Sequence, residues 1–465
     1  MTKLNLTHVM RLTRTSTAMA LAGALSACSF IPTYERPAAP VAAIFPGATV
    51  SASQVAAADL AWQDFFADAR LKKLIEIALT NNRDLQVAAL NISKAQAQYQ
   101  IQRAAQFPSV NGALAAQRQA KTTDVYTLGV GITSFELDFF GRVQSLKEAT
   151  LAQYLSTEES RKTVQISLIA AVANTYLSML ADEQLLALTR ETLGTREQSF
   201  KLSKLRFDNG VTSELDLRLA QGLVEGARAN LAQLQRQRAQ DENALVLLLG
   251  QSLPADLPAG GQLGSQSQLL KDIPVGLPSD LLNRRPDIRA AEQQLLSANA
   301  NIGAARAAFF PRISLTASVG KASSELGNLL SGGIGWAFAP QLVVPIFNMG
   351  ANQANLDAAK ITRQITVAQY DKAIQTAFRE VADALAGTAT LSEQYRATQA
   401  QVDAAKASYK LSDLRYGGGV ASYLDLLDAQ RSLFVAQQAA IQVQLAQLQN
   451  QVTLYKALGG GWTAP

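Results

Sequence analysis

Hydrophobic and polar residues alternate along four short segments of the chain. In the clearest of them, Tyr126, Leu128, Val130 and Ile132 alternate with threonine and glycine residues. A period of two is typical of a β-strand with one apolar face, and a tilted strand of roughly nine to eleven residues is long enough to cross a bilayer. The alternation predicts amphipathic strands at residues 109–118, 126–138, 312–320 and 334–346.

Outside these segments, apolar residues recur at helical spacing over long stretches. Residues 141–209 contain no proline and one internal glycine, Gly194, and Ile169, Val172 and Tyr176 keep the three- and four-residue spacing of a coiled coil. At about 1.5 Å per residue, such a helix would be on the order of 100 Å long. The pattern predicts helices at residues 82–106, 141–209, 214–249, 285–309, 350–415 and 422–458.

The two halves of the chain repeat one another. Residues 206–217 (RFDNGVTSELDL) correspond to residues 415–426 (RYGGGVASYLDL), and residues 82–108 correspond to residues 285–311. Matches at many separated positions in one register indicate a duplicated unit, which replaces the three domains that a length of 465 residues would suggest. Each half is predicted to run helix, strand, strand, long helix, helix.

This repeat sets the expected domain organisation. Proline-, glycine- and alanine-rich residues 29–60 and 251–280 show no helical periodicity and are expected to wrap the outside of the helices. The expected segments are a signal peptide at 1–27, an N-terminal segment at 28–81, a first repeat at 82–250, a connection at 251–284, a second repeat at 285–459 and a tail at 460–465.

The N-terminus has the pattern of a secretion signal. Three basic residues within residues 1–15 precede a short apolar run at 17–25, which is too short to span a bilayer as a helix. The following Leu25-Ser26-Ala27-Cys28 is similar to a bacterial lipobox, which implies cleavage after Ala27 and lipid attachment at Cys28. Ser29 at the next position then points to the outer membrane. A plain signal peptide with an incidental cysteine is the alternative interpretation.

Composition excludes most kinds of chemistry. The only histidine is His8 and the only cysteine is Cys28, so the chain after residue 28 has no imidazole or thiol for nucleophilic catalysis, disulfides or soft metal sites. Removing residues 1–27 takes away three positive charges and lowers the net charge from +5 to +2, which gives no reason to expect nucleic-acid binding. We therefore expect a protein that is not an enzyme and that has no cofactor and no metal site.

Four strands cannot close into a barrel. An open edge cannot face lipid, because its backbone polar groups would be unpaired there, and known barrels start at eight strands. The lipobox and the lack of any other core for the apolar strand faces favour the membrane over an ordinary soluble hairpin. The chain is therefore expected to form oligomers of two or more copies.

The sequence resembles the TolC-like outer-membrane factors of tripartite efflux pumps. Within that family it is similar to the OprM-type multidrug efflux lipoproteins. The resemblance covers essentially the whole mature chain. It is carried by Cys28-Ser29, Tyr34–Pro37, Phe135–Arg142, Arg284–Ile288, Ala304–Pro311, Pro345–Phe347, Arg415–Tyr416, Asp425–Arg431 and Tyr455–Trp462.

The resemblance implies a mainly α fold with a β-barrel, assembled as a homotrimer. Twelve strands would form a barrel in the cell outer membrane, and twelve helices would continue it as a periplasmic α-barrel. The protein would be the passive, gated exit duct of an RND-type multidrug efflux pump. Its partners would be a periplasmic adaptor, an inner-membrane RND transporter and outer-membrane lipid.

The resemblance also implies where such a duct would be gated. Acids matching Asp425 and Asp428 project into the closed end of the tunnel in the family, and threefold symmetry would turn each into a ring. Capping is the plainer interpretation of Ser213…Asp216 and Ser422…Asp425, because serine at an N-cap and an acid in the first turn stabilise a helix start. The predicted gate residues are Tyr416, Leu424, Asp425, Asp428 and Arg431.

The turns after the two long helices are the predicted contacts for the adaptor. Small residues there would let another helical hairpin approach closely. The predicted contact residues are Gly210, Val211, Ser213, Gly419, Val420 and Ser422.

Other functions remain open from the residues alone. A periplasmic coiled-coil scaffold would lack the strand pairs, and an envelope enzyme that used Asp425 and Asp428 would need a pocket that the pattern does not indicate. Protein secretion or metal efflux would suit the same duct. The mature chain has only Met179 and Met349 as thioether ligands, which makes a metal relay implausible without excluding metal export.

Overall fold

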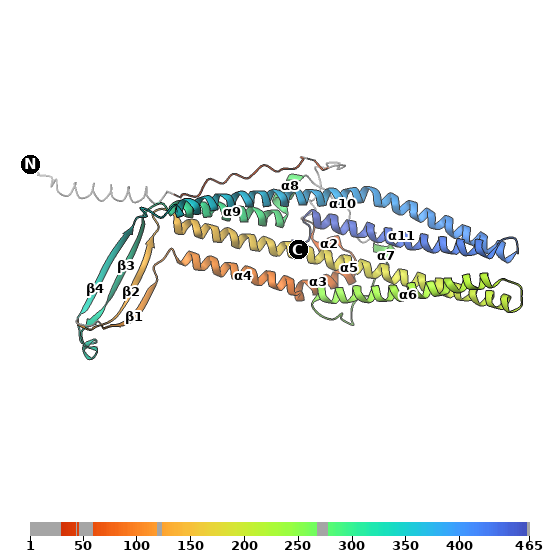
Figure 1. Cartoon of the computed structure of the whole chain (residues 1–465), viewed down its shortest axis with the longest axis horizontal. Coiled ribbons are helices and arrows are strands. Elements are labelled where there is room, and N and C mark those ends of the chain that lie inside the picture. The colour runs from red at the N-terminus through yellow and green to blue at the C-terminus, as the bar shows by residue number, and fades with distance from the viewer. Residues whose placement is uncertain (1–28, 43, 46–58, 119–122, 267–277, 463–465) are drawn as a thin grey trace, which may run out of the picture. The chain divides into compact units, whose positions relative to one another are not determined.

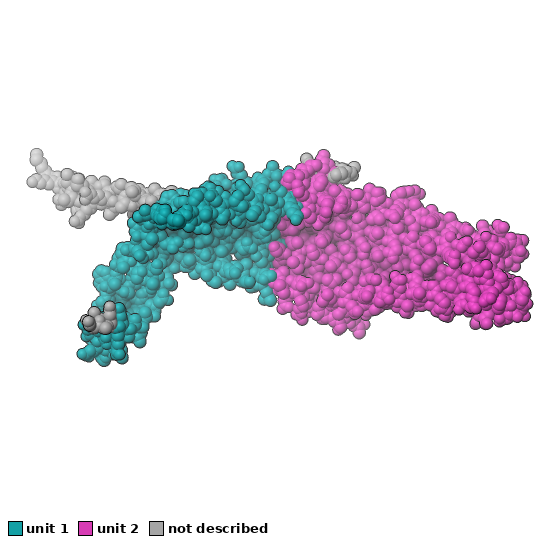
Figure 2. Space-filling model, in the orientation of Figure 1, with its two compact units in different colours: residues 1–39, 90–159, 290–372 teal, residues 40–89, 160–289, 373–465 magenta. Residues whose placement is uncertain are grey.

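The computed structural model describes residues 29–42, 44–45, 59–118, 123–266 and 278–462. The signal peptide and Cys28 lie outside the described residues. The chain divides into two compact units, and Figure 2 shows each in its own colour. Unit 1 comprises residues 1–39, 90–159 and 290–372, and unit 2 comprises residues 40–89, 160–289 and 373–465.

The strands of unit 1 form one antiparallel sheet in the order β1-β2-β3-β4 (Figure 1). Their bounds are Val110–Gln117 for β1, Val125–Leu137 for β2, Arg312–Ser323 for β3 and Ile334–Val343 for β4. β3 continues past the expected end at residue 320 because Lys321 and Ser323 still pair with β2. β4 ends before the expected residue 346, close to Pro345, which has no amide hydrogen for the ladder.

A β-bulge in β2 explains a change of phase in the sequence. Apolar residues occupy even positions up to Ile132 and odd positions from Phe135, and the register between β2 and β3 shifts between these two residues. Ser134 lies in the left-handed region with φ of 53°, and its backbone amide donates to Thr316 Oγ1 at 3.1 Å. The extra residue keeps the large apolar side chains from Tyr126 to Leu137 on one face of the sheet.

Six long helices occur at the predicted places, in two copies of the same order. They are α4 (Arg83–Ala104), α5 (Arg142–Asp208), α6 (Glu214–Leu249), α9 (Pro286–Ala307), α10 (Ala351–Gly417) and α11 (Tyr423–Ala457). α4 and α9 end two residues before their predicted ends, since each leads into a Phe-Pro pair and the residue before proline disfavours the α region. The expected mainly α chain with a small antiparallel sheet is confirmed.

The core of unit 2 is built by helices on both sides of one long helix. α5 lies between α3 (Ala69–Asn81), the end of α6 and the end of α11, and Phe65 stacks on Tyr455 with ring centroids 4.1 Å apart. Among the described residues, α5 is the helix long and apolar enough to cross a membrane by length and composition. Because 61% of its most apolar stretch is buried, this core accounts for that composition.

Within the described ranges, four shorter helices were not among the predicted elements. α2 (Trp62–Phe65), α7 (Leu263–Gln266) and α8 (Pro278–Arg284) are too short to show a periodic pattern, although residues 251–280 were expected to contain no helix. α3 has thirteen residues and buries Leu71, Leu74, Ile75 and Ala78, so its three- and four-residue spacing was a signal that the prediction missed.

Candidate functional site

The sheet of unit 1 has one apolar face. Residues paired directly across the ladder point to the same side, so the strand register places the large apolar residues of all four strands together. This apolar face comprises Val110, Leu114, Tyr126, Leu128, Val130, Ile132, Phe135, Leu137, Ile313, Leu315, Ala317, Val319, Ile334, Trp336, Phe338 and Leu342.

Much of this face is uncovered in the single chain. Trp336 is 81% exposed and Ile334 is 75% exposed, and every residue of β1 and β4 is exposed. From Ile334 to Leu342 the strand measures about 27 Å at 3.4 Å per residue, close to the apolar band of about 25 Å on outer-membrane barrels. An apolar band of this height requires lipid or another apolar surface against it.

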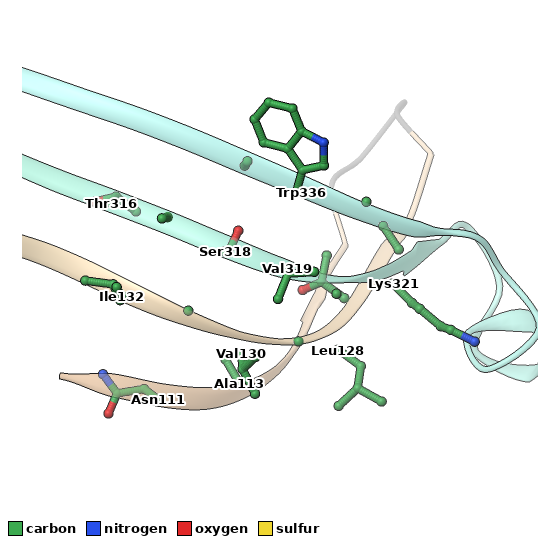
Figure 3. A pocket seen from close by; sticks show the side chains of 18 of the residues that line it. Asn111, Ala113, Leu128, Val130, Ile132, Thr316, Ser318, Val319, Lys321 and Trp336 are labelled. Atoms are coloured by element: carbon green, nitrogen blue, oxygen red, sulfur yellow. The ribbon is translucent and has the colours of Figure 1, made fainter. Parts of the chain in front are cut away.

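The opposite face carries small and polar residues. It is hollowed by a cavity of about 500 Å³ (Figure 3), whose lining includes Asn111, Thr127, Thr316 and Ser318. This polar face could line a water-filled passage, since threonine, serine and asparagine can hydrogen-bond to water at its wall.

Two paired glycines let β2 and β3 approach closely on the polar face. Gly129 pairs with Gly320, and a Cβ added to Gly320 would lie 2.4 Å from the carbonyl oxygen of Leu128. Only glycine fits at these positions, which is typical of tight bending in a barrel wall.

The outer strands of the sheet have open edges. β1 pairs only with β2 and β4 only with β3 among the described residues. Each outer strand therefore leaves a row of backbone donors and acceptors without partners, which cannot be placed in lipid unless another strand pairs with them.

An N-terminal strap, which we define as residues 29–37, is bonded to α9. The Arg36 guanidinium donates from Nε and Nη2 to the two carboxylate oxygens of Glu292 at 2.7 and 2.6 Å, and the Tyr34 hydroxyl donates to the same carboxylate at 3.0 Å. Burial and the Glu292 charge raise the pKa of Tyr34 above its ordinary value. A bidentate, partly buried pair of this kind fixes the direction of the strap.

Two more contacts carry the strap towards the sheet end of α9. Asn299 Nδ2 donates to the Pro32 carbonyl at 2.7 Å, and Arg306 Nη1 donates to the Phe30 carbonyl at 3.2 Å. The Phe30 ring stacks on Phe310 with centroids 4.6 Å apart. Because the three α9 anchors are spaced by seven residues, the strap follows one face of the helix and brings Ser29 close to the start of β3.

In unit 2, the turns after α5 and α10 have the same structure. Gly210 and Gly419 adopt φ of 71° and 73°, and the next residues, Val211 and Val420, donate their amides to the carbonyls of the residues five positions earlier. This is a Schellman end, in which glycine is needed for the left-handed conformation. The two turns, together with the residues that cap α6 and α11, are called the helix tips below, and both valines are exposed there.

Serine caps begin the helices after both turns. The Ser213 hydroxyl accepts the Asp216 amide at 3.2 Å, and Ser422 and Asp425 form a complete capping box. Hydrogen bonds from Thr212 and Ser213 hold the pKa of the Asp216 carboxyl below its usual range. Capping thus occupies the carboxylates of both acids in the single chain.

The predicted gate residues of α11 form one exposed stripe. This gate stripe consists of Leu424, Asp425, Asp428 and Arg431, and half of the Leu424 surface is exposed. Arg431 Nη1 lies 3.5 Å from Asp428 Oδ1 on the same helix, with side chains 49% and 62% exposed. An exposed ion pair at this spacing contributes little to stability. Neither packing nor this ion pair therefore explains why these residues are present.

Tyr416 is the predicted gate residue that links two helices. Arg206 of α5 donates to the Tyr416 hydroxyl and lies over its ring, with the guanidinium carbon 5.2 Å from the centroid. Tyr416 also contacts Tyr423 at a centroid distance of 5.4 Å. Arg206 was not among the predicted gate residues, although Arg206 and Arg415 begin the matched repeats.

A pair of acids between α5 and α6 was also missed. Asp182 is 7% exposed, and its Oδ2 has no hydrogen-bond partner in the described structure. The Asp182 carboxyl group also interacts with the Asp241 carboxyl group of α6. Burial and the nearby Asp241 charge raise the pKa of Asp182 to about 7, while Arg238 partly offsets this effect. Gln237 donates to Asp241 Oδ1 at 3.1 Å. In the sequence, an aspartate within the apolar part of α5 was the signal that could have identified this pair.

The described residues contain no group of three histidine, cysteine, aspartate or glutamate side chains that could hold a metal ion. The predicted adaptor contacts lie on the helix tips, Tyr416 lies at the end of α10, and the gate stripe lies near the start of α11. Cys28, the predicted lipid attachment site, lies outside the part of the chain that the structure describes.

Comparisons with known proteins agree with this arrangement. Residues 74–251 and 277–460 match the family described as "Outer membrane efflux protein". The chain is 50% identical over 454 residues to the "Antibiotic efflux pump outer membrane protein ArpC" and to the "Toluene efflux pump outer membrane protein TtgC", both of Pseudomonas putida; each alignment covers 94% of this chain and 93% of the relative. The chain is also similar to the open state of the Neisseria gonorrhoeae MtrE outer membrane channel, with a TM-score of 0.86, 44% identity and coverage of 94% and 99% of the two chains.

The buried acid pair gives a prediction for stability against pH. The folded-state pKa of Asp182 is raised, so the folded protein holds a proton that the unfolded chain releases at lower pH. The contribution of Asp182 to stability should therefore be fully present below the ordinary carboxyl range and should be lost as the pH rises through about 7. Asp182→Asn should remove most of this fall when the loss of helical circular dichroism on heating is compared at pH 5 and pH 8. Exposed Asp403→Asn is the control, and an unchanged slope in Asp182→Asn would show that the pair does not share a proton.

Proposed function

The chain belongs to the outer membrane efflux protein family and is the outer-membrane channel of an efflux pump, and we propose that it exports antibiotics and organic solvents as the exit duct of a tripartite assembly. The observation that carries the proposal is the open, four-stranded sheet with one apolar and one polar face. Such a sheet supplies part of the wall of a pore and no catalytic centre.

Three copies would close the sheet into a twelve-stranded barrel. Two copies would give eight strands, and the interior of an eight-stranded barrel is filled by side chains or holds one small ligand. Twelve strands are the next multiple of four and leave a wider lumen lined by the polar face. This argument and the family resemblance together favour a homotrimer over a dimer.

Lipid attached at Cys28 would hold the strap end at the membrane surface. Ser29, the next residue, lies where the strap reaches the end of α9 and the start of β3. A lipid anchor there would enter the leaflet beside the barrel wall without stretching the chain. The contacts of the strap with Glu292 and Arg306 of α9 support this placement.

The helix tips would dock a periplasmic adaptor, which in turn would join an inner-membrane RND transporter. Gly210, Val211, Ser213, Gly419, Val420 and Ser422 lie on these tips. The exposed valines and small residues offer a surface that a helical hairpin can approach closely. The left-handed glycines and the serine caps keep that surface in one shape.

The gate stripe and Tyr416 would close the duct at the tips. A threefold axis would bring three copies of Leu424 and of the acids together, and closely spaced acids repel one another unless cations or arginine neutralise them. The Arg206–Tyr416 contact would resist this repulsion by holding α10 to α5. A similar channel is described in an open state, which supports a duct with more than one state.

Antibiotics and solvents are favoured over the other candidate cargoes. The similar proteins are named for antibiotic and toluene efflux, which does not support protein secretion. The absence of histidine and cysteine after residue 28 gives a metal no soft ligands along the duct apart from two methionines. A scaffold in the aqueous periplasm would leave the apolar face of the sheet exposed to water, which is unfavourable.

Deleting the gene should raise susceptibility to a panel of antibiotics and to toluene, and the wild-type gene should restore resistance. Complementation with Ser213→Phe/Ser422→Phe should fail because the added rings block the adaptor, whereas Ser213→Ala/Ser422→Ala loses only the caps, about 1 kcal/mol each. Trimer content on gels is the control for assembly. Full resistance with the phenylalanine variant would rule out docking at the tips.

Cys28→Ala should abolish incorporation of labelled palmitate while leaving the strand and helix content unchanged. The measurement is autoradiography of the purified protein from cells grown with the label. Ser29→Ala is the control and should be labelled like the wild type. Label that persists in Cys28→Ala would exclude this cysteine as the acylation site.

Loss of the Arg206–Tyr416 contact should favour the open duct. Arg206→Met and Tyr416→Phe should each raise the open probability in planar lipid bilayers by roughly the tenfold that corresponds to about 1.4 kcal/mol. Arg218→Met, which changes an exposed arginine of α6, should conduct like the wild type. Wild-type conductance in both test variants would contradict a gate at this contact.

A further inference from the structure

A second arginine of α5 is buried at the same end of unit 2 without a carboxylate partner. Arg196 is 8% exposed, and no acid of the described residues forms an ion pair with it. Its Nε has no hydrogen-bond partner. Burying an arginine in this way costs free energy, so the side chain must contribute something other than a charge pair.

Arg196 contacts two other helices. Its Nη1 donates to the Leu223 carbonyl of α6 at 3.1 Å, and its guanidinium carbon lies 5.3 Å from the ring centroid of Phe434 on α11. A desolvated cation over an aromatic face is attracted to the ring. One side chain thus joins α5, α6 and α11.

On α11, these contacts lie next to the gate stripe, on the side away from the turn before α11. Phe434 is three residues after Arg431, and therefore less than one helical turn from the last residue of the stripe. Below it, Tyr423, Leu426 and Leu427 of α11 pack against Ala220 and Leu223 of α6. Burial lowers the pKa of Arg196, and the charge of Arg431 adds to this effect. Arg431 itself is exposed and pairs with Asp428 of the same helix.

The contact joins the two repeats and is made only once. The position of Arg196 in the second repeat is Ala405, and the position of Phe434 in the first repeat is Glu225, which pairs with Arg228 on the surface. Duplication of the helix pair therefore does not account for it. The contact is made only to α11, the helix that also carries the gate stripe.

We propose that Arg196 is a positioning residue of the gate, which holds α11 against the α5–α6 pair and keeps the gate stripe in its closed position. The proposal rests on the proposed gate. In this role Arg196 acts through its contacts with Leu223 of α6 and Phe434 of α11. Releasing it would free α11 to move while the apolar contacts at the tip are still present.

The test compares full-length trimers in planar lipid bilayers. Arg196→Leu and Phe434→Leu should each raise the open probability about tenfold, corresponding to about 1.4 kcal/mol, and the double variant should not exceed the larger single effect, because both remove one contact. Arg196→Lys should restore only part of the closure, since lysine keeps the charge without the planar face. Arg190→Leu, at an exposed position of the same helix, should behave like the wild type.

The outcomes separate this proposal from the gate itself. If Arg206→Met opens the duct but Arg196→Leu and Phe434→Leu do not, the gate stands and the role of Arg196 is overturned. Independent, multiplicative effects of the two substitutions would also overturn it. If Arg196→Leu yields no trimers, Phe434→Leu decides the question, and closed channels in every variant would overturn both the gate and this proposal.

Discussion

The structure depends on the backbone hydrogen-bonding groups along the open edges of the sheet. A hydrocarbon layer offers no partner for an unpaired amide or carbonyl, and each one left there costs several kcal/mol. The apolar face of this sheet nevertheless requires an apolar surrounding. These two demands are met together only when other copies of the chain supply the missing strands, so the membrane part of the molecule is incomplete in one chain.

The helices meet a different constraint. α5 and α10 satisfy their backbone groups internally over 67 residues each, and they need only partners for their apolar stripes. Within unit 2, the short helix α3 and the ends of α6 and α11 supply those partners for α5. Val402 of α10 packs against Ala436 and Ala440 of α11. Three other contacts are polar or cation–aromatic: Glu292 holds the N-terminal strap, Arg206 holds Tyr416, and Arg196 joins α5 to α6 and α11. Such contacts set the positions of the helices more than they add stability.

Much of this arrangement could be predicted from the sequence because its signals are local or repeated. Alternation identified the strands, and the matched halves identified the order of helices. The bulge at Ser134 was visible as a change of phase in the apolar positions, and α3 as a short amphipathic pattern; neither was recognised. The serine caps followed from residue type and spacing alone.

Contacts across helices could not be read in the same way. Arg206 and Tyr416 are 210 residues apart, and Arg196 and Phe434 are 238 apart, so no local pattern joins them. Arg431 was expected to take part in polar contacts around the gate, and in the structure it pairs with Asp428 of its own helix. The buried Asp182–Asp241 pair depends on the rotation of two helices about their axes, which spacing does not determine closely enough.

The central claim is that other copies of the chain complete the sheet. The most direct measurement combines the mass of the purified protein in detergent with hydrogen exchange at the backbone amides of β1 and β4. We expect a mass of three chains and slow exchange at both outer strands, as strong as in β2 and β3. A folded single chain that stays dispersed without detergent, with rapidly exchanging β1 and β4, would contradict the account.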